Sequence, residues 1–92
     1  MIKGFRCKET EKVFQRRYTR KFSGIQRIAL RKLLILDAAG SLDDLRVPPA
    51  NRLEKLVGDR KGQHSIRVSD QWRVCFRWRA GHAYEVEIVD YH

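Results

Sequence analysis

The last three residues of the sequence, Asp90, Tyr91 and His92, combine a carboxylate, a phenol and an imidazole. An unperturbed imidazole titrates near pH 6.5, so His92 can give or take a proton around neutrality. Tyr91 can donate a proton or stack on a nucleobase, and Glu54 offers a second base. Metal-free RNA cleavage needs a base for the 2′-hydroxyl and an acid for the leaving 5′-oxygen. These residues supply candidates for both roles, but Tyr91 at the edge of a core and Asp90 paired with an arginine are ordinary alternatives.

The same chemistry needs cations for the charge that develops on the phosphate. Arg73, together with Arg67 or Lys55, is the candidate group for holding that phosphate. Arg60 and Arg77 are further candidates for binding the RNA strand. Arginine suits this role because its planar guanidinium can grip a phosphate through two parallel hydrogen bonds.

The overall charge favours a polyanionic partner. The 92 residues carry 20 Lys and Arg against 11 Asp and Glu, a formal net charge of +9, and 13 of those 20 cations are Arg. A sequence that is 42% hydrophobic and 10% aromatic is too apolar for a disordered tail. We therefore expect one small folded domain, residues 1–92, that binds nucleic acid or a ribonucleoprotein.

The elements that would position these side chains follow from the hydrophobic pattern. The best helix runs from Ile25 to Ala39, where apolar residues recur every three or four positions, with Ser23 as a plausible cap. Gly40 ends it, and the segment from Ser41 to Pro49 is predicted to be a loop. The remaining predictions are a short strand around residues 2–5, a helix over 9–17, and strands over 52–57, 63–68, 72–79 and 84–91. This order predicts an α+β fold with two helices packed on a largely antiparallel sheet.

Strand register predicts which side chains meet. In the strand over 72–79, alternation places Trp72, Val74, Phe76 and Trp78 on a core face and Arg73, Cys75, Arg77 and Arg79 on a basic face. A three-residue loop at 80–82 pairs Trp78 with Tyr84 and Val74 with Ile88, and sets Arg77 against Glu85.

A three-residue turn at 69–71 pairs Ile66 with Val74 and sets Arg67 directly opposite Arg73. Like charges in that position are destabilising unless an anion lies between them, so a phosphate would fit there. The alternative is that the two guanidiniums splay apart into water. On this register, Tyr91 would lie near Arg73 at the same corner of the sheet.

Three segments together carry a family resemblance: Gly58 to Gly62, Gln71 to Phe76, and the terminal Asp-Tyr-His. In this combination the sequence resembles the HigB-type toxins of the RelE/ParE superfamily over nearly its whole length. The resemblance implies a microbial-ribonuclease-like, RelE-like fold and cleavage of mRNA in the ribosomal decoding site. It also implies neutralisation by a HigA-type helix-turn-helix antitoxin, with operator DNA bound only through the antitoxin complex.

The resemblance places an acidic residue, a base-stacking or acid tyrosine and a terminal histidine at Asp90, Tyr91 and His92. The sequence departs from the family upstream, where Glu54 and Val57 stand in place of a histidine and a lysine. This departure puts one proton-transfer group and one cation in doubt. Two functions of other classes stay open, a ParE-like poison of DNA gyrase and a non-catalytic nucleic-acid-binding module.

The cysteines and the start of the sequence indicate the expected setting. Cys7 and Cys75 lie far apart and form no metal-ligand spacing, so neither a disulfide framework nor a metal or other cofactor is expected. The start lacks the apolar stretch of a signal peptide, and no run of residues is long enough to span a membrane. We therefore expect a cytoplasmic protein with no membrane partner.

Overall fold

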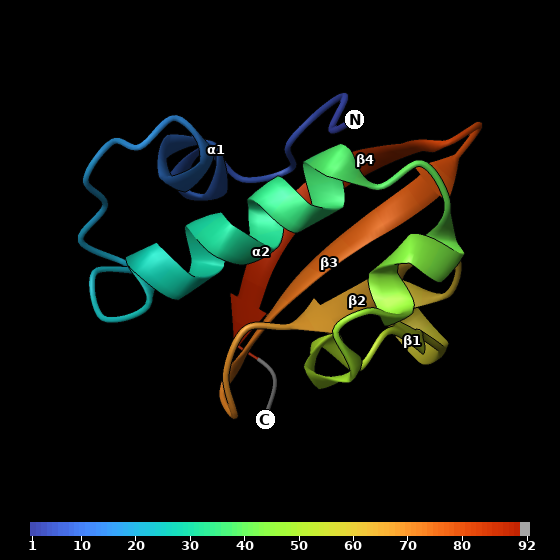
Figure 1. The fold of residues 1–92 in the computed structure, drawn as a ribbon. Helices are drawn as coiled ribbons and strands as arrows, with labels where there is room; N and C mark the ends of the chain where they lie inside the picture. The colour runs from blue at the N-terminus through green and yellow to red at the C-terminus, as the bar shows by residue number, and fades with distance from the viewer. Residues whose placement is uncertain (91–92) are drawn as a thin grey trace.

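The computed structural model describes residues 1–90 and confirms the α+β prediction. Two helices, α1 (Lys8–Phe14) and α2 (Gln26–Ala38), precede the strands β1 (Glu54–Lys55), β2 (His64–Arg67), β3 (Trp72–Arg79) and β4 (His82–Asp90). Within the described part of the chain, these strands form one antiparallel sheet in the order β1-β2-β3-β4. Figure 1 shows α1 and α2 lying across the same face of the sheet, over β3 and β4.

The core lies between that face and the helices. Helix α2 buries Ala29, Leu33 and Leu36, as the helical spacing predicts. The facing side chains of the sheet include Ile66, Val74, Phe76, Val86 and Ile88. Trp72 and Trp78 pack against this cluster, which confirms the predicted core face of β3.

Two predictions for the first third of the chain are wrong. Residues 2–5 form no strand: Ile2 and Phe5 make single parallel bridges to Ala83 and Val86 at the free edge of β4. Ser23 does not cap α2, since the N-cap is Ile25 and no side chain caps the helix. The Ser23 amide instead bonds the Arg20 carbonyl in the turn that precedes the helix.

The segment predicted as a loop contains two short 3-10 helices, η1 (Leu42–Arg46) and η2 (Pro49–Asn51). Ser41 and Asp44 form a capping box at the start of η1, which fixes that turn. The buried Asn51 donates to the carbonyls of Leu45 and Val47, so η2 is tied to η1. A third 3-10 helix, η3 (Gly58–Arg60), precedes β2.

The β3-β4 hairpin corrects the predicted register in part. The turn uses two residues, Ala80 and Gly81, both with positive φ, so Trp78 pairs with Ala83 and not with Tyr84. A bulge at Glu85, where φ is 51°, then adds one residue to β4 and restores the predicted pairing of Val74 with Ile88. The hairpin therefore combines a shorter turn with a compensating bulge. The predicted ion pair of Arg77 with Glu85 is confirmed, with 2.9 Å between Nε and Oε2.

The register of β2 with β3 is confirmed, including Ile66 opposite Val74 and Arg67 opposite Arg73. The predicted basic face of β3 is only partly basic at its surface, because Arg73 and Cys75 are both buried. Backbone and side chains from the segment between α2 and β2 cover that part of the face. The sheet thus has a helix-covered face and a second face that is covered at one corner.

Candidate active site

Arg73 is the best-anchored cation on the second face of the sheet. Its Nε donates to the Ser65 hydroxyl at 2.7 Å, and its Nη2 donates to the Arg52 carbonyl at 2.6 Å. A longer bond of 3.4 Å joins Nη2 to the Ser65 carbonyl. These acceptors are neutral, so they fix the orientation of the guanidinium without cancelling its charge.

The segment that follows η2 supplies part of this anchor. Arg52 adopts a left-handed conformation, with φ 44° and ψ 58°, at the end of η2. This turn presents the Arg52 carbonyl to Arg73 and leads directly into β1. The main chain of Arg52, which no residue-type pattern singles out, is therefore a structural part of the site.

Strand β1 brings Glu54 to Arg73. The Glu54 Oε1 lies 3.9 Å from Nη1 of Arg73, and the Glu54 side chain is 51% exposed whereas that of Arg73 is 8% exposed. The carboxylate thus approaches the guanidinium from the solvent side at ion-pair distance, beyond hydrogen-bond range. Glu54 and Arg73, two of the predicted site residues, therefore lie close together at this corner of the sheet.

Lys55 does not share this site. It pairs with His64 in the sheet, whereas Glu54 pairs with Ser65. Because side chains alternate along a strand, Lys55 projects to the opposite side of β1 from Glu54. Of the two cations considered as companions of Arg73, only Arg67 shares its face.

Arg67 lies opposite Arg73 in the register, as predicted. No bound anion is required to offset the repulsion between the two guanidiniums. Arg67 forms an ion pair with the exposed Asp70 in the adjacent turn. Arg73 is held by the acceptors described above and by Glu54. Protein groups therefore offset the repulsion of this pair, and the opposed arginines are not in themselves a signal for phosphate.

The end of β4 carries the remaining predicted acid. Asp90 pairs with Trp72 in the register, and its Oδ2 accepts a hydrogen bond of 3.0 Å from the Gln71 side chain. Tyr91 and His92, the predicted proton donors, lie outside the described residues. The structure thus shows where the strand leading to them ends, beside the turn between β2 and β3.

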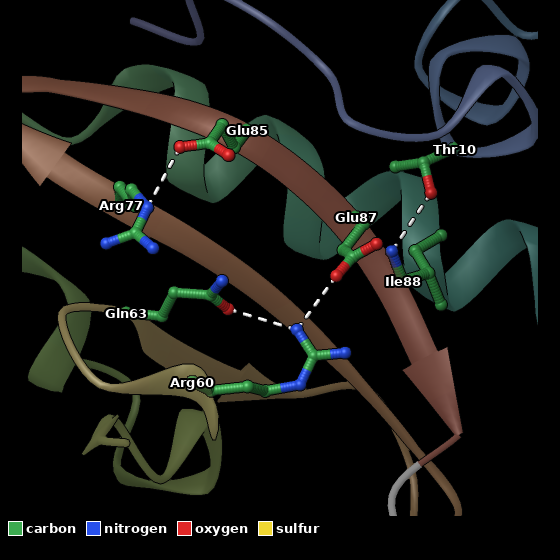
Figure 2. Close-up of polar contacts among 7 residues, drawn as sticks. All are labelled: Thr10, Arg60, Gln63, Arg77, Glu85, Glu87 and Ile88. Carbon is green, nitrogen blue, oxygen red and sulfur yellow. Dashed lines mark hydrogen bonds and ion pairs between the residues drawn. The ribbon is translucent and has the colours of Figure 1, made fainter. Parts of the chain in front are cut away.

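Arg60 and Arg77, the other predicted RNA-binding cations, lie elsewhere on the same face and are ion-paired (Figure 2). The Nη1 of Arg60 donates to Glu87 at 2.8 Å and to Gln63 at 3.1 Å. Beneath them, burial raises the pKa of the Cys75 thiol, so this side chain stays uncharged at neutral pH. Arg77 packs against Gly62, where a Cβ would lie 2.6 Å from Nη1, so a larger residue at position 62 would displace the guanidinium.

The structure adds Ser65 to the site, a residue that no residue-type pattern in the sequence singles out. The correctly predicted register already placed Ser65 on the same face as Arg67 and Arg73, so the signal was present. The Ser65 hydroxyl matters because Arg73 is buried and needs an acceptor there, and the sequence does not predict that burial.

The two histidines among residues 1–90, His64 and His82, both lie in strands of the sheet. His64 stacks on Phe76, with ring centroids 6.1 Å apart, on the core side as predicted. Burial, and then the charge of Lys55, lower the pKa of His64. His82 is the first residue of β4, directly after the turn.

Residues 1–90 contain no helix that is long and apolar enough to cross a membrane. No group of three or more His, Cys, Asp or Glu side chains in that range is arranged to hold a metal ion.

The comparison that decides the family is a match of residues 3–92 to the model of the RelE-like toxin of type II toxin-antitoxin system HigB. The chain belongs to this family. It is 52% identical over 59 residues to "Toxin HigB-1" of Vibrio cholerae, a match that covers 64% of this chain and 62% of the Vibrio protein. It is 34% identical over 94 aligned positions to "Endoribonuclease HigB" of Proteus vulgaris, with 100% of both chains covered. The match to the Vibrio toxin thus spans less than two thirds of that relative.

Proposed function

We propose that this HigB-family toxin is a metal-independent endoribonuclease that cleaves mRNA on translating ribosomes in the cytoplasm and so arrests translation and growth. The observation that carries the proposal is the anchoring of Arg73, a buried cation oriented by neutral acceptors and close to Glu54, beside the end of β4, which carries Asp90 and leads to Tyr91 and His92. The Proteus relative, which is named an endoribonuclease and aligns along the whole chain, supports the same reaction.

In the proposed reaction, the 2′-hydroxyl oxygen attacks the adjacent phosphorus and the bond from phosphorus to the 5′-oxygen breaks. A base removes the proton of the 2′-hydroxyl, and an acid protonates the departing 5′-oxygen. The products are a 2′,3′-cyclic phosphate and a free 5′-hydroxyl, so no water or metal is consumed.

Arg73 is the proposed phosphate ligand. The negative charge on the phosphate oxygens grows in the transition state, and a cation already in place stabilises that charge without reorganisation. The phosphate would take the position that the Glu54 carboxylate holds in the structure, since this carboxylate is half exposed and contacts Arg73 only at 3.9 Å.

Glu54 and His92 are the proposed proton-transfer groups. Glu54 would move from Arg73 to the 2′-hydroxyl, and His92 would protonate the leaving oxygen, with Tyr91 as a stacking group or a second donor. Asp90 would orient this end of the chain through Gln71. A carboxylate is a weaker general base than an imidazole, so we expect a comparatively slow enzyme.

The proposed partners follow from the same scheme. The ribosome would present the mRNA, and a HigA-type antitoxin with a helix-turn-helix would neutralise the toxin and carry it to operator DNA. A toxin with a net charge of +9 would otherwise bind cellular RNA indiscriminately. Co-expression with the neighbouring gene tests this step, and the absence of any co-purifying protein would contradict it.

The decisive experiment measures message cleavage in a reconstituted translation reaction. We expect cleavage with translating ribosomes, no cleavage of the same message alone, and no effect of 1,10-phenanthroline at constant Mg²⁺. Deletion of His92 should lower the single-turnover rate by about 10²–10⁴-fold. A folded deletion variant that still cleaves at the original rate would exclude His92 as the acid. Intact transcripts together with double-strand DNA breaks in induced cells would favour gyrase as the target.

A further inference from the structure

A polar cleft of about 400 Å³ opens on the second face of the sheet, separate from the Arg73 corner. Its lining residues come from three parts of the chain: Arg6, Asp59, Arg60, Gln63 and Glu87. Figure 2 shows Arg60 and Gln63 reaching from the segment before β2 toward Glu87 on β4, across β3. The proposed reaction assigns no step to the groups in this cleft.

The groups in this cleft are held in fixed orientations. The side chain of Glu87 is only 16% exposed, and its Oε1 accepts a hydrogen bond of 2.8 Å from Arg60. Gln63 is 3% exposed, and its Oε1 accepts a second bond from the same Arg60 nitrogen. This second bond determines which end of the Gln63 amide is oxygen, so the Nε2 group points away from Arg60.

The Nε2 group of Gln63 is a hydrogen-bond donor that a ligand in the cleft can use. Among residues 1–90, Gln63 uses its side chain only as an acceptor from Arg60. Nε2 is not one of the buried, unpaired side-chain atoms among residues 1–90, so solvent reaches it and an acceptor on a ligand can replace that solvent. Beside it, Glu87 retains the lone pairs of its second oxygen, and Asp59 adds another carboxylate at the rim.

The position of the cleft relates it to the proposed phosphate ligand. Glu87 pairs with Cys75 in the register, and the next pair on this face is Arg73 with Val89. Two residues along an antiparallel strand span about 7 Å. A phosphate at Arg73 would therefore have its neighbouring nucleotide within reach of the cleft.

We propose that the cleft formed by Gln63 and Glu87 is a subsite for a nucleobase next to the scissile phosphate, and that guanine fits it best. The proposal rests on the proposed ribonuclease function. Guanine offers two adjacent N–H donors, N1 and N2, to the Glu87 carboxylate and its O6 acceptor to the Gln63 amide. Adenine offers one donor group on that edge, and uracil offers one. The second oxygen of Glu87 beside the Gln63 amide donor therefore matches the Watson–Crick edge of guanine, while Arg6 and Arg60 line the rest of the cleft.

The test uses two matched substitutions on β4. Glu87→Gln keeps an oxygen for Arg60 and replaces the other oxygen by a donor, so it should remove the preference for guanine. Glu85→Gln is the control, because Glu85 lies on the same strand and also pairs with an arginine, Arg77. Thermal unfolding of both variants shows whether they fold like the unmodified protein.

The first readout is binding of 3′-GMP, 3′-AMP and 3′-UMP, followed by NMR at the Gln63 side-chain amide. These three nucleotides carry the same phosphate, so differences among them report the base. We expect the unmodified protein and Glu85→Gln to bind 3′-GMP about tenfold more tightly than the other two, and Glu87→Gln to bind all three within about twofold. Equal binding by the unmodified protein, or an unchanged preference in Glu87→Gln, would overturn the proposal.

The second readout maps cleavage positions in a mixed message on ribosomes. We expect guanine to be enriched at one fixed position next to the cut, and this enrichment to disappear in Glu87→Gln. Cleavage without any such enrichment would refute the subsite and leave the ribonuclease function standing. A preference for 3′-GMP without cleavage of any message would refute the ribonuclease function and leave the subsite standing.

Discussion

Arg73 and Arg60 lie on the same face of one sheet, yet the protein holds them in different ways. Arg73 is anchored by a hydroxyl and by main-chain carbonyls, and the Glu54 carboxylate lies 3.9 Å from its Nη1. Arg60 donates at 2.8 Å to a carboxylate that is itself mostly buried. The first arrangement preserves a positive charge for a substrate, whereas the second neutralises it within the fold.

This difference separates two roles that the sequence does not distinguish. A buried ion pair whose partner is removed leaves an uncompensated charge, so its loss is felt in the free energy of unfolding. A cation held by neutral acceptors contributes its charge to a ligand, so its loss is felt in the reaction rate. Substitution of Arg60 should therefore change mainly the free energy of unfolding, whereas substitution of Arg73 should change mainly the reaction rate.

The largest expected effect is on the rate at the Arg73 corner. Arg73→Ala should lower single-turnover cleavage on programmed ribosomes by about 10²–10³-fold, because the cation that stabilises the transition state is lost. Arg73→Lys should retain part of the activity, since it keeps the charge and loses the two-pronged contact. Circular dichroism monitors folding of both variants. Full activity in a folded Arg73→Ala protein would remove this residue from the site.

The second effect is on stability at the centre of the face. Arg60→Ala should lower the free energy of unfolding by about 1–3 kcal/mol, because Glu87 and Gln63 both lose their donor. Total cleavage, summed over all sites in a message, should fall less than in Arg73→Ala. Urea unfolding and the ribosome assay, performed on the same preparations, measure the two quantities. An Arg60→Ala variant that is as stable as the parent but inactive would instead give Arg60 a direct role in the reaction.

Much of the sheet could be predicted because its strands alternate strongly. The register of β2 with β3 follows from matching Ile66 to Val74, and it correctly places Arg67 opposite Arg73. The hairpin register was harder, since pairing hydrophobic residues favours a single offset along both strands. The bulge at Glu85 changes the offset halfway along the hairpin. A glutamate rarely adopts a positive φ, so its residue type does not predict this bulge.

The candidate site was predicted only in outline, because burial depends on parts of the chain that are distant in sequence. The alternation along β3 predicts that Arg73 lies at the surface. In the structure, the main chain of Arg52 contacts its guanidinium and helps to bury it. By contrast, the separation of Glu54 from Lys55 was available from the sequence, since neighbours on a strand point to opposite faces. Ion pairs such as Arg60 with Glu87 link residues 27 positions apart and required the fold.

A third, smaller effect tests the carboxylate at the corner. Glu54→His should raise the single-turnover rate several-fold at pH 7, because an imidazole accepts a proton near neutrality more readily than a carboxylate. Glu54→Gln is the matched control, since it removes the negative charge beside Arg73 without supplying a base. An increase in the histidine variant alone would place this position in the proton path, whereas equal increases would mean that the carboxylate only competes with the phosphate. No increase in either variant would exclude both roles.

The smallest effect concerns His64, which lies on the core side of the sheet beside the strand that carries Glu54. Burial lowers the pKa of His64 below its ordinary value of 6.5, so the unfolded chain binds a proton at pH values where the folded chain does not. Stability should therefore fall as the pH decreases through 6.5 toward the lower pKa of the folded state, and be insensitive to this group above about pH 7.5. His64→Phe removes the titration and keeps an aromatic ring against Phe76, so its melting temperature should fall less between pH 7.5 and pH 5.5 than that of the parent. Equal decreases in the two proteins would assign the acid sensitivity to other groups. If the melting temperature decreases with pH in the parent but not in His64→Phe, then His64 on the core side sets the response to mild acid. The ion pairs of the open face would then contribute little to that response.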